Sequence, residues 1–483
     1  MEIKTVENKK KARKKNKKNV TSVAATAADA DPSLQYLKDP SNTPIIQSAR
    51  AFFSSPRFAQ HLDAPYRVYI GPINAWRSVS KLAVRGSARR GDNNRIVTNK
   101  SIGLFSPNSH NIIPCLSSPV HHPAINIVGK LVEEGCVVNQ ITGYRENSDS
   151  GLVRYLLLSV ELATNKVQVT FVINQIPTDG TPECLQKLIE WLCTGKKRSR
   201  QIHSVWVHFH PSSVQMDSGI AGKHNNSITG RMCDSWIHVY GEKMLRLRMI
   251  LKDMDHDDVD NVNDTEKMTR GRKRKRDGDS DDVDKVVIPV PKLCFPPNVF
   301  RQSNFTGFSR IVSSLRQYVP KKSRIIELYG GVGTIGFQLL DLAKRLECSD
   351  ENPYNADCFE KTLSDFVAES KFDRSREKKC RRRVKYIHSS AADRAVAPEG
   401  FDGFDLLLVD PPRKGLDAEV INALLQAPNS IKRLIYVSCG FKAFMKNCDE
   451  LLVNAWTLVH VEGHVLFPGS DHIETLAIFD RKS

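Results

Sequence analysis

The stretch ELYGGVGTIG, residues 327–336, decides which kind of domain ends this chain. It completes an apolar run, RIIELY (324–329), and overlaps the start of a second one, GTIGFQLLDLAKRL (333–346). Its glycines have the spacing G-x-G-x-x-G, which is typical of a turn that binds a nucleotide cofactor between a strand and a helix. The match alone is weak, but it predicts a strand, a tight turn and then a helix over residues 333–346.

The same order of strand, turn and helix repeats down to the C-terminus. FDLLLV precedes DAEVINALLQA, RLIYVS precedes FKAFMKNCDELL, and LVHVE and ETLAIF follow. Strands that alternate with helices form a doubly wound sheet, which binds its ligands at the carboxyl ends of the strands. We therefore predict an α/β fold for residues 289–483, with a mainly parallel, Rossmann-like sheet.

The chain before this domain has a different pattern. Residues 65–250 contain β-branched and aromatic runs bounded by turn formers, and these predict the strands RVYIGPI, IGLFSP, RYLLLSVEL, KVQVTFVIN and SVWVHFH. PECLQKLIEWLCTG has apolar residues at helical spacing and ends in a glycine, so it predicts a helix. Residues 65–250 are thus expected to form an α+β domain.

Two segments have the composition of disordered chain. The first twenty residues hold nine Lys or Arg against two Glu, and we predict that residues 1–64 are a basic disordered arm and leader. Residues 251–288 are predicted to be a charged disordered insertion, in which a basic cluster at 270–276 lies between acidic blocks. Each basic run could be an import signal or a contact to RNA, and the first could also be only a solvated leader.

The whole chain has 483 residues and a formal net charge of +17, which indicates a polyanionic partner, most simply nucleic acid. Its 11 cysteines are spread out without a C-x2-C pair, a pattern that favours reduced thiols inside the cell and no metal site. We expect no membrane segment, a monomer, and a location in the nucleus, the cytoplasm or an organelle.

The glycine-rich stretch suits an adenosyl group that carries no phosphate. Glu327 closes the strand, and glycine at positions 330, 331 and 333 lets the backbone approach a bulky ligand. A carboxylate for the ribose hydroxyls is expected about 20 residues on, where Asp350 is the candidate and Glu351 its rival. S-adenosylmethionine is the favoured ligand; a dinucleotide, or a tight turn without cofactor, stays open.

The stretch FDLLLVDPPRKGL, residues 404–416, delivers Asp410 to the edge of the sheet. Pro411 and Pro412 then fix φ and remove two backbone donors, which makes a rigid wall. Such a wall suits a flat base held beside a methyl donor.

Cys439 ends the apolar run LIYVSCGFKAF, and Glu474 begins the last strand in DHIETLAIF. A free cysteine at such a place is usually a buried core residue, and a glutamate at a strand start is usually solvated. Neither residue identifies a site without the other motifs.

In order along the chain, FRQSN (300–304), ELYGGVG, DPPRKG, YVSCG and DHIET resemble the RNA uridine-5 methyltransferase family. This resemblance covers about 290–483. It extends more weakly over 65–250, where WRSVSKLAV, IGLFSPNSHNIIPC, SPVHHPAIN and SGLVRYLLL are similar to the central RNA-contacting domain of that family. A methyltransferase sheet preceded by an RNA-contacting domain is the fold that the resemblance implies.

The resemblance implies that Cys439 is the nucleophile and Glu474 the base. It also implies that S-adenosylmethionine is bound by Gln302, Tyr329, Gly331, Gly333, Thr334, Asp350 and Asp410. Some positions depart from the family pattern: Gly440 and Phe441 replace the usual asparagine and proline, Thr334 a common asparagine, and Asp350 the usual glutamate. These departures put the choice of target in doubt.

The implied reaction is methylation of carbon 5 of a uridine in tRNA or rRNA. A thiolate adds to carbon 6, the activated ring takes the methyl group, and a base removes the proton so that the thiolate leaves. Arg413 is expected to favour the thiolate. Two alternatives stay open: an amino-methyltransferase, which uses an Asp-Pro-Pro turn without a cysteine, and a non-catalytic RNA-binding or chaperone protein on a methyltransferase fold.

Overall fold

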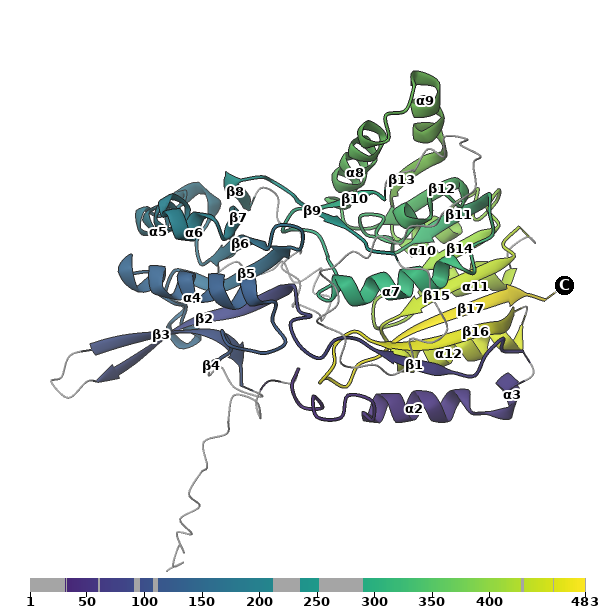
Figure 1. Cartoon of the computed structure of the whole chain (residues 1–483), viewed down its shortest axis with the longest axis horizontal. Coiled ribbons are helices and arrows are strands. Elements are labelled where there is room, and N and C mark those ends of the chain that lie inside the picture. Colours follow the sequence, from purple (N-terminus) through teal and green to yellow (C-terminus); the bar gives the residue numbers. More distant parts are fainter. Residues whose placement is uncertain are drawn as a thin grey trace, which may run out of the picture.

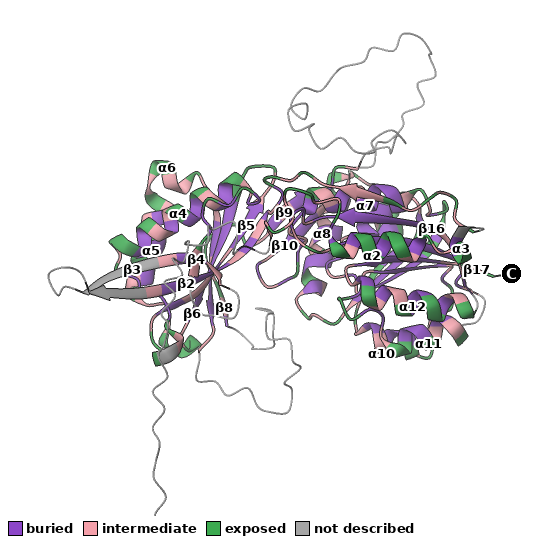
Figure 2. Cartoon of the chain, turned by 90° about the horizontal axis from the view of Figure 1, so that it is seen from below, coloured by how far each residue is buried: buried purple, intermediate pink, exposed green. Residues whose placement is uncertain are grey.

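The computed structural model describes residues 31–482 except 32, 60, 91–95, 107–111, 212–234, 252–289, 427–429 and 455. Residues 1–30, which include the basic first twenty residues, and residues 252–288 of the predicted charged insertion lie outside the described residues. Figure 1 shows two lobes, each built on one large β-sheet. In Figure 2 the buried residues gather along the strands of both sheets.

The C-terminal lobe contains an eight-stranded sheet in the order β1-β16-β17-β15-β14-β11-β12-β13. Its strands are β1 (Arg67–Ile70), β11 (Ser323–Leu328), β12 (Ala343–Asp350), β13 (Val384–His388), β14 (Leu406–Val409), β15 (Arg433–Ser438), β16 (Trp456–Val465) and β17 (Glu474–Arg481). Only β17 is antiparallel to its neighbours in this sheet. The prediction of a doubly wound, mainly parallel sheet is confirmed.

Helices cover both faces of this sheet. They are α2 (Pro44–Phe53), α3 (Pro56–Ala59), α7 (Phe305–Arg316), α8 (Asn355–Glu369), α9 (Arg374–Arg383), α10 (Ala391–Val396), α11 (Ala418–Gln426) and α12 (Phe441–Val453). One core holds apolar residues of α7 and α8, and a second core holds those of α2, α11 and α12. These two cores hold the helices against the two faces of the sheet.

The strand order reverses beside β11. From β11 the chain runs to β12 and β13 on one side, and then returns to β14 on the other. At such a reversal the loops that follow two neighbouring strands diverge, and ligands bind in the crevice between them. The loops after β11 and β14 begin with Tyr329 and Asp410.

The predicted helix over residues 333–346 is wrong. The structure has a short 3₁₀ turn, η3 (Gly336–Leu339), and β12 already begins at Ala343, where it pairs with Ser323 of β11. Phe337 and Leu339 are completely buried, so tertiary packing and strand pairing decide the conformation here rather than helical spacing.

The prediction of disorder is wrong for residues 44–59, which form α2 and α3. Ile46, Ala49 and Phe53 lie on one face of α2 and are buried in the C-terminal lobe. The strand in RVYIGPI exists as β1, but it pairs with β16 and therefore belongs to the eight-stranded sheet rather than to the α+β domain. The apolar spacing in α2 is the signal that the composition of this leader obscured.

The other lobe contains a seven-stranded sheet in the order β4-β3-β2-β5-β6-β7-β8. Its strands are β2 (Val79–Arg90), β3 (Ile96–Phe105), β4 (Ile112–Pro114), β5 (Val153–Glu161), β6 (Lys166–Ile173), β7 (Ile202–Phe209) and β8 (Trp236–Gly241). With it are α4 (Pro123–Val138), α5 (Glu183–Thr194), α6 (Lys196–Ser199), η1 (Glu146–Ser148) and η2 (Pro177–Asp179). The expected helix is α5, whereas α4 and β2 had no clear signal.

A two-stranded sheet of β9 (Leu245–Arg248) and β10 (Lys292–Phe295) connects the lobes in the chain. Its residues Leu247 and Phe295 join the core of the C-terminal lobe. Among the described helices, none has the length and apolar composition needed to cross a membrane.

Candidate active site

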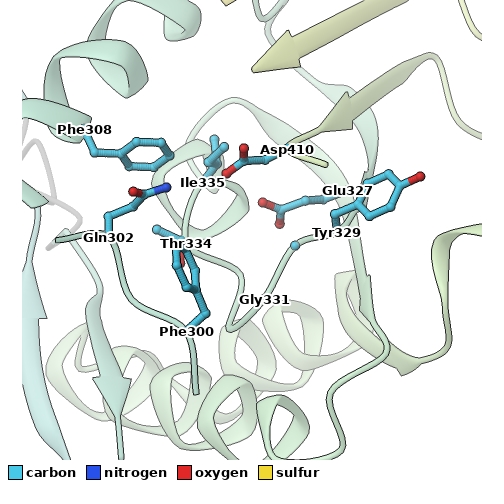
Figure 3. Close-up of a pocket in the computed structure, with 10 residues that line it drawn as sticks. Phe300, Gln302, Phe308, Glu327, Tyr329, Gly331, Thr334, Ile335 and Asp410 are labelled. Carbon is cyan, nitrogen blue, oxygen red and sulfur yellow. The ribbon is translucent and has the colours of Figure 1, made fainter. Parts of the chain in front are cut away.

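A pocket opens at the carboxyl ends of β11 and β14, at the reversal of the strand order. Its empty space, which includes part of the open solvent at its mouth, is about 370 Å³. Figure 3 shows side chains converging on it from the loops after both strands and from the segment before α7. The lining residues are Phe300, Gln302, Phe308, Glu327, Tyr329, Gly330, Gly331, Thr334, Ile335 and Asp410.

The pocket is acidic. Its ten described lining residues include two carboxylates, Glu327 and Asp410, and no Lys or Arg. Burial raises the pKa of Asp410 to about 7. Burial also raises the pKa of Glu327 to about 7, although the backbone N–H of Gly336 donates to this carboxylate and lowers it. The pocket therefore suits a cationic ligand and opposes a pyrophosphate.

The glycine turn exposes its backbone to the pocket. Gly331 has φ of +55°, and a Cβ added there would meet nothing within 4 Å. Its N–H donates to Oδ2 of Asp350 at 2.9 Å, and the N–H of Gly330 donates to the carbonyl of Ser349 at 2.9 Å. The loop is thus held against the end of β12, and glycine leaves room for a ligand above it.

The predicted cofactor residues divide into two groups. Gln302, Tyr329, Gly331, Thr334 and Asp410 line the pocket, whereas Gly333 and Asp350 support it from behind. Gly333 has φ of +79° and packs against the ring of Phe359. The second carboxylate oxygen of Asp350 accepts from the backbone N–H of Asn352 and from Nδ2 of Asn355.

The position of Tyr329 differs from that of the other lining side chains. Its hydroxyl donates to Oδ2 of Asp417 at 3.0 Å, and Figure 3 shows the ring pointing away from Gln302 and Thr334. Tyr329 also has a positive φ of 56°, unusual for a residue with a side chain. It therefore presents mainly its backbone to the pocket.

Sequence reasoning missed the apolar wall of the pocket, which consists of Phe300, Phe308 and Ile335. Phe300 is 69% exposed, unusual for a phenylalanine in a folded domain. It begins the FRQSN motif, and Phe308 lies on the first turn of α7, so their positions beside Gln302 were the available signal.

The FRQSN segment joins the pocket to the other lobe. Arg301 is buried and donates to the carbonyls of Val160 and Ser78 at 3.0 and 2.7 Å. Asn304 caps α7 by accepting from the N–H of Gly307, and its Nδ2 donates to the carbonyl of Leu466. Since these neighbours are fixed on both sides, Gln302 between them is held toward the pocket.

Cys439 and Glu474 lie opposite each other at the ends of neighbouring strands. In the antiparallel register of β15 and β17, Ser438 pairs with Thr475, so the next position places Cys439 beside Glu474. Sγ of Cys439 lies 3.7 Å from the carbonyl oxygen of Pro411 in the Asp-Pro-Pro turn. Residues from three separate motifs therefore meet at one corner of the sheet.

This corner concentrates acidic groups in a dry environment. Burial, and then the nearby carboxylates of Glu474 and Asp410, raise the pKa of Cys439 to about 12, and Arg413 lowers it only in part. Burial and Asp410 raise the pKa of Glu474 to about 8. Arg413 thus favours the thiolate, as expected, but burial and the two carboxylates outweigh its effect on the pKa of Cys439.

The two residues after Cys439 fit their surroundings closely. A Cβ at Gly440 would lie 2.3 Å from the carbonyl oxygen of Arg413, so only glycine allows this approach. Phe441 is buried, and its ring lies 5.9 Å from that of Phe52 and 6.0 Å from that of Phe53 on α2. The departure at Phe441 is thus matched by aromatic residues of the N-terminal helix.

Within the described ranges, no cluster of three or more His, Cys, Asp or Glu side chains is placed to hold a metal ion.

Together, the strand order, the acidic pocket at the reversal and the Asp-Pro-Pro corner define a Rossmann-like methyltransferase.

Comparison with known proteins narrows this class. The tRNA (uracil-5-)-methyltransferase family model matches residues 399–482. An uncharacterized RNA methyltransferase of Protochlamydia amoebophila is 30% identical over 413 residues, which cover 85% of this chain and 87% of that protein. One from Geobacter sulfurreducens is 24% identical, over 84% of this chain and 66% of that protein. The chain therefore belongs to the RNA methyltransferase family, and the resemblance found in its motifs is confirmed.

A solved structure has the same fold. The tRNA (uracil-54, C5)-methyltransferase of Pyrococcus abyssi, in complex with S-adenosyl-L-homocysteine, superposes with a TM-score of 0.55 at 17% sequence identity. The superposition covers 86% of this chain and 77% of that chain. Both lobes are therefore part of the shared architecture.

Proposed function

We propose that this RNA methyltransferase methylates carbon 5 of a uridine, with S-adenosylmethionine as the methyl donor. The observation that carries the proposal is that Cys439 and Glu474 directly follow and precede the paired residues Ser438 and Thr475, beside Asp410, which also lines the pocket. A nucleophile, a base and a cofactor site would then share one corner of the sheet.

The pocket fits the cofactor by charge and by shape. S-adenosylmethionine supplies an electrophilic methyl group on a positively charged sulfonium when it is bound. Glu327 and Asp410 offer carboxylates to its cationic groups, the backbone at Gly331 leaves open space, and Phe300 offers an aromatic face. The Pyrococcus abyssi enzyme, whose structure contains S-adenosyl-L-homocysteine, supports this assignment. A dinucleotide is disfavoured, since no α-helix follows the turn to receive a pyrophosphate.

Cys439 would act on the base itself. Its thiolate would form a bond to carbon 6, and the electron pair of the C5–C6 double bond would move to carbon 5. Carbon 5 would take the methyl group from the donor, whose sulfur would keep the electron pair of the broken bond as a neutral thioether. Glu474 then accepts the proton from carbon 5. The C5–H electron pair restores the double bond, and the sulfur–carbon bond breaks to release the thiolate.

The raised pKa of Cys439 means that ligand binding must favour loss of the thiol proton. The thiol of Cys439 loses its proton only when charge is supplied close by, because its pKa is about 12 in the free chain. Arg413 is the cation that already lowers this pKa. We infer that a bound cationic donor beside Asp410 acts in the same direction, since an added positive charge favours the thiolate.

We propose tRNA as the substrate to test first. The matching family model is that of tRNA (uracil-5-)-methyltransferases, and it covers the stretch that contains Cys439 and Glu474. A ribosomal RNA target stays the alternative. In either RNA the uridine must leave its stack, so a loop or a flipped base is expected.

The decisive experiment is covalent trapping. RNA transcribed with 5-fluorouridine is incubated with the full chain and S-adenosylmethionine, since fluorine cannot be removed as a proton and the adduct then survives a denaturing gel. Wild type should form the adduct, Cys439→Ala should not, and Cys184→Ala on α5 serves as the matched control. Activity retained by Cys439→Ala would instead indicate an amino-methyltransferase, and no adduct on tRNA or rRNA would contradict the proposal.

A further inference from the structure

One face of the seven-stranded sheet carries polar and aromatic side chains instead of a core. Because cross-strand partners share a face, the register defines two rows across it. One row is Ala83, Tyr155, Val172, His208 and Trp236, and the other is Lys81, Leu157, Thr170, Trp206 and His238. The opposite face packs on α4 and α5 with apolar residues such as Leu82, Leu156 and Phe171. We call the face with the two rows the sheet-face site.

The aromatic end of the sheet-face site lies on β7 and β8, at the edge of the sheet. The rings of His208 and Trp236 are stacked, with centroids 4.0 Å apart and planes 14° apart, and those of Trp206 and His238 are 4.9 Å apart. Trp206 and Trp236 are half-buried, so part of each ring faces solvent. An edge of this kind offers flat surfaces on which planar bases can stack.

Polar atoms on this face lack partners. Within the described part of the chain, Nε1 of Trp206, Nε2 of His238 and Oγ1 of Thr170 are buried without a hydrogen bond. Burial lowers the pKa of His238, so this ring stays neutral and keeps a nitrogen that can accept a hydrogen bond. Water or a polar ligand would satisfy these atoms.

The other end of the sheet-face site holds two cations. Nζ of Lys81 lies 4.6 Å from the ring centroid of Tyr155, and Nη1 of Arg154 donates to Nδ1 and to the carbonyl of His210, each at 2.9 Å. Among the described residues neither Lys81 nor Arg154 has a carboxylate partner. Burial and the charge of Arg154 lower the pKa of Lys81, so electrostatic repulsion between the two cations costs free energy. A bound phosphate would remove that cost.

We propose that the sheet-face site binds unpaired nucleotides of the RNA, with a phosphate at Lys81 and Arg154 and bases stacked on the rings of β7 and β8. The choice of RNA as the ligand rests on the proposed function. The site begins close to the active site, because Ser78 just before β2 donates its N–H to the carbonyl of Ser303. Arg301 likewise contacts Val160 near the end of β5. RNA bound there would reach toward the segment that holds Gln302.

The test measures binding of two labelled probes to the full chain by fluorescence anisotropy, at 50 to 200 mM salt: a 20-nucleotide single-stranded RNA and a duplex of the same sequence. Lys81→Met should lower the slope of log K against log salt by about 0.7, the value for one phosphate contact to a single strand. Trp236→Leu should weaken single-strand binding by about fivefold or more and affect the duplex less. Lys130→Met, exposed on α4 behind the sheet, is the matched control and should bind like wild type.

His238→Ala is a second aromatic variant, used in case Trp236→Leu does not fold. His238 lies on β8 at the edge of the sheet, where a smaller side chain should disturb folding least. The proposal is overturned when Lys81→Met, Trp236→Leu and His238→Ala all bind the single strand as tightly, and with the same salt slope, as Lys130→Met. This result is distinct from failure of the proposed function, which would appear as a wild-type protein that forms no adduct on 5-fluorouridine RNA.

Discussion

Gly440 lies directly against the backbone of Arg413, so that the turn after Cys439 and the Asp-Pro-Pro turn have no space between them. A Cβ at this glycine would approach the carbonyl oxygen of Arg413 to 2.3 Å, and a backbone oxygen cannot rotate away as a side chain can. This contact fixes the distance between the nucleophile and the wall that would hold the base.

Gly440→Ala should therefore lower both stability and activity. We expect the free energy of unfolding to fall by about 1–3 kcal/mol, as for other overpacked sites, and methyl transfer to fall with it. Urea unfolding followed by circular dichroism measures the change. Gly71→Ala, where the nearest atom is 3.5 Å away, is the control. Equal stability of the two variants would mean that the two turns separate easily.

Glu474→Gln should separate the two halves of the reaction. The amide cannot accept the proton from carbon 5, so an adduct should accumulate on RNA that contains ordinary uridine. Wild type should show this adduct only with 5-fluorouridine. Denaturing gels of both RNAs make the comparison, and full turnover by Glu474→Gln would assign the base to another residue.

The rate at which the methylated adduct breaks down to product should rise with pH. The pKa of Glu474 is raised to about 8 by burial, so near pH 7 only a minor fraction is the carboxylate that can act as a base. Between pH 7 and 9 the ionised fraction grows by about tenfold. The profile is measured as the single-turnover rate at which methylated RNA is released from the adduct, at saturating RNA and cofactor. A rate that falls over the same interval would contradict the assignment.

Binding of S-adenosylmethionine should weaken in acid. The pKa of Asp410 is raised to about 7, so the carboxylate that attracts a cation is lost as the pH falls through this value. Asp410→Asn should bind the sulfonium about tenfold more weakly at pH 8 and abolish most of the pH dependence. Calorimetry with neutral S-adenosylhomocysteine is the internal comparison, and the exposed Asp402→Asn is the control variant. Equal losses for both ligands would argue against a charge effect.

Phe53→Ala should unfold the C-terminal lobe more easily. Phe53 is 5% exposed and its ring contacts those of Tyr66 and Phe441, so its removal should cost about 3–5 kcal/mol. Ile127→Ala, on the exposed side of α4, should stay within about 0.5 kcal/mol of wild type. Thermal unfolding followed by fluorescence compares the two. A small effect at Phe53 would mean that α2 contributes little to the core.

Sequence patterns predicted the parts of the fold that depend on short repeats. The alternation of strands and helices placed Asp410 and Cys439 at strand ends, because period and turn residues act locally. They failed where distant contacts decide: within residues 333–346 the chain forms a short 3₁₀ turn and then enters β12 at Ala343, and α2 is held by a core that its own composition does not indicate. The raised pKa of Cys439 could not be predicted either, since it depends on burial and on Asp410 across the sheet.

The attachment of the N-terminal segment to the last strands has a consequence for synthesis on the ribosome. His460 on β16 contacts Asp63, which precedes it by 397 residues, and β1 pairs along the same strand. The segment around α2 and β1 leaves the ribosome long before β16, because 397 residues separate Asp63 from His460. Contacts of such separation form slowly. The active-site lobe thus completes its sheet only after β16 and β17 have been synthesised, and a nascent chain stalled before β16 would expose the apolar face of α2 to chaperones.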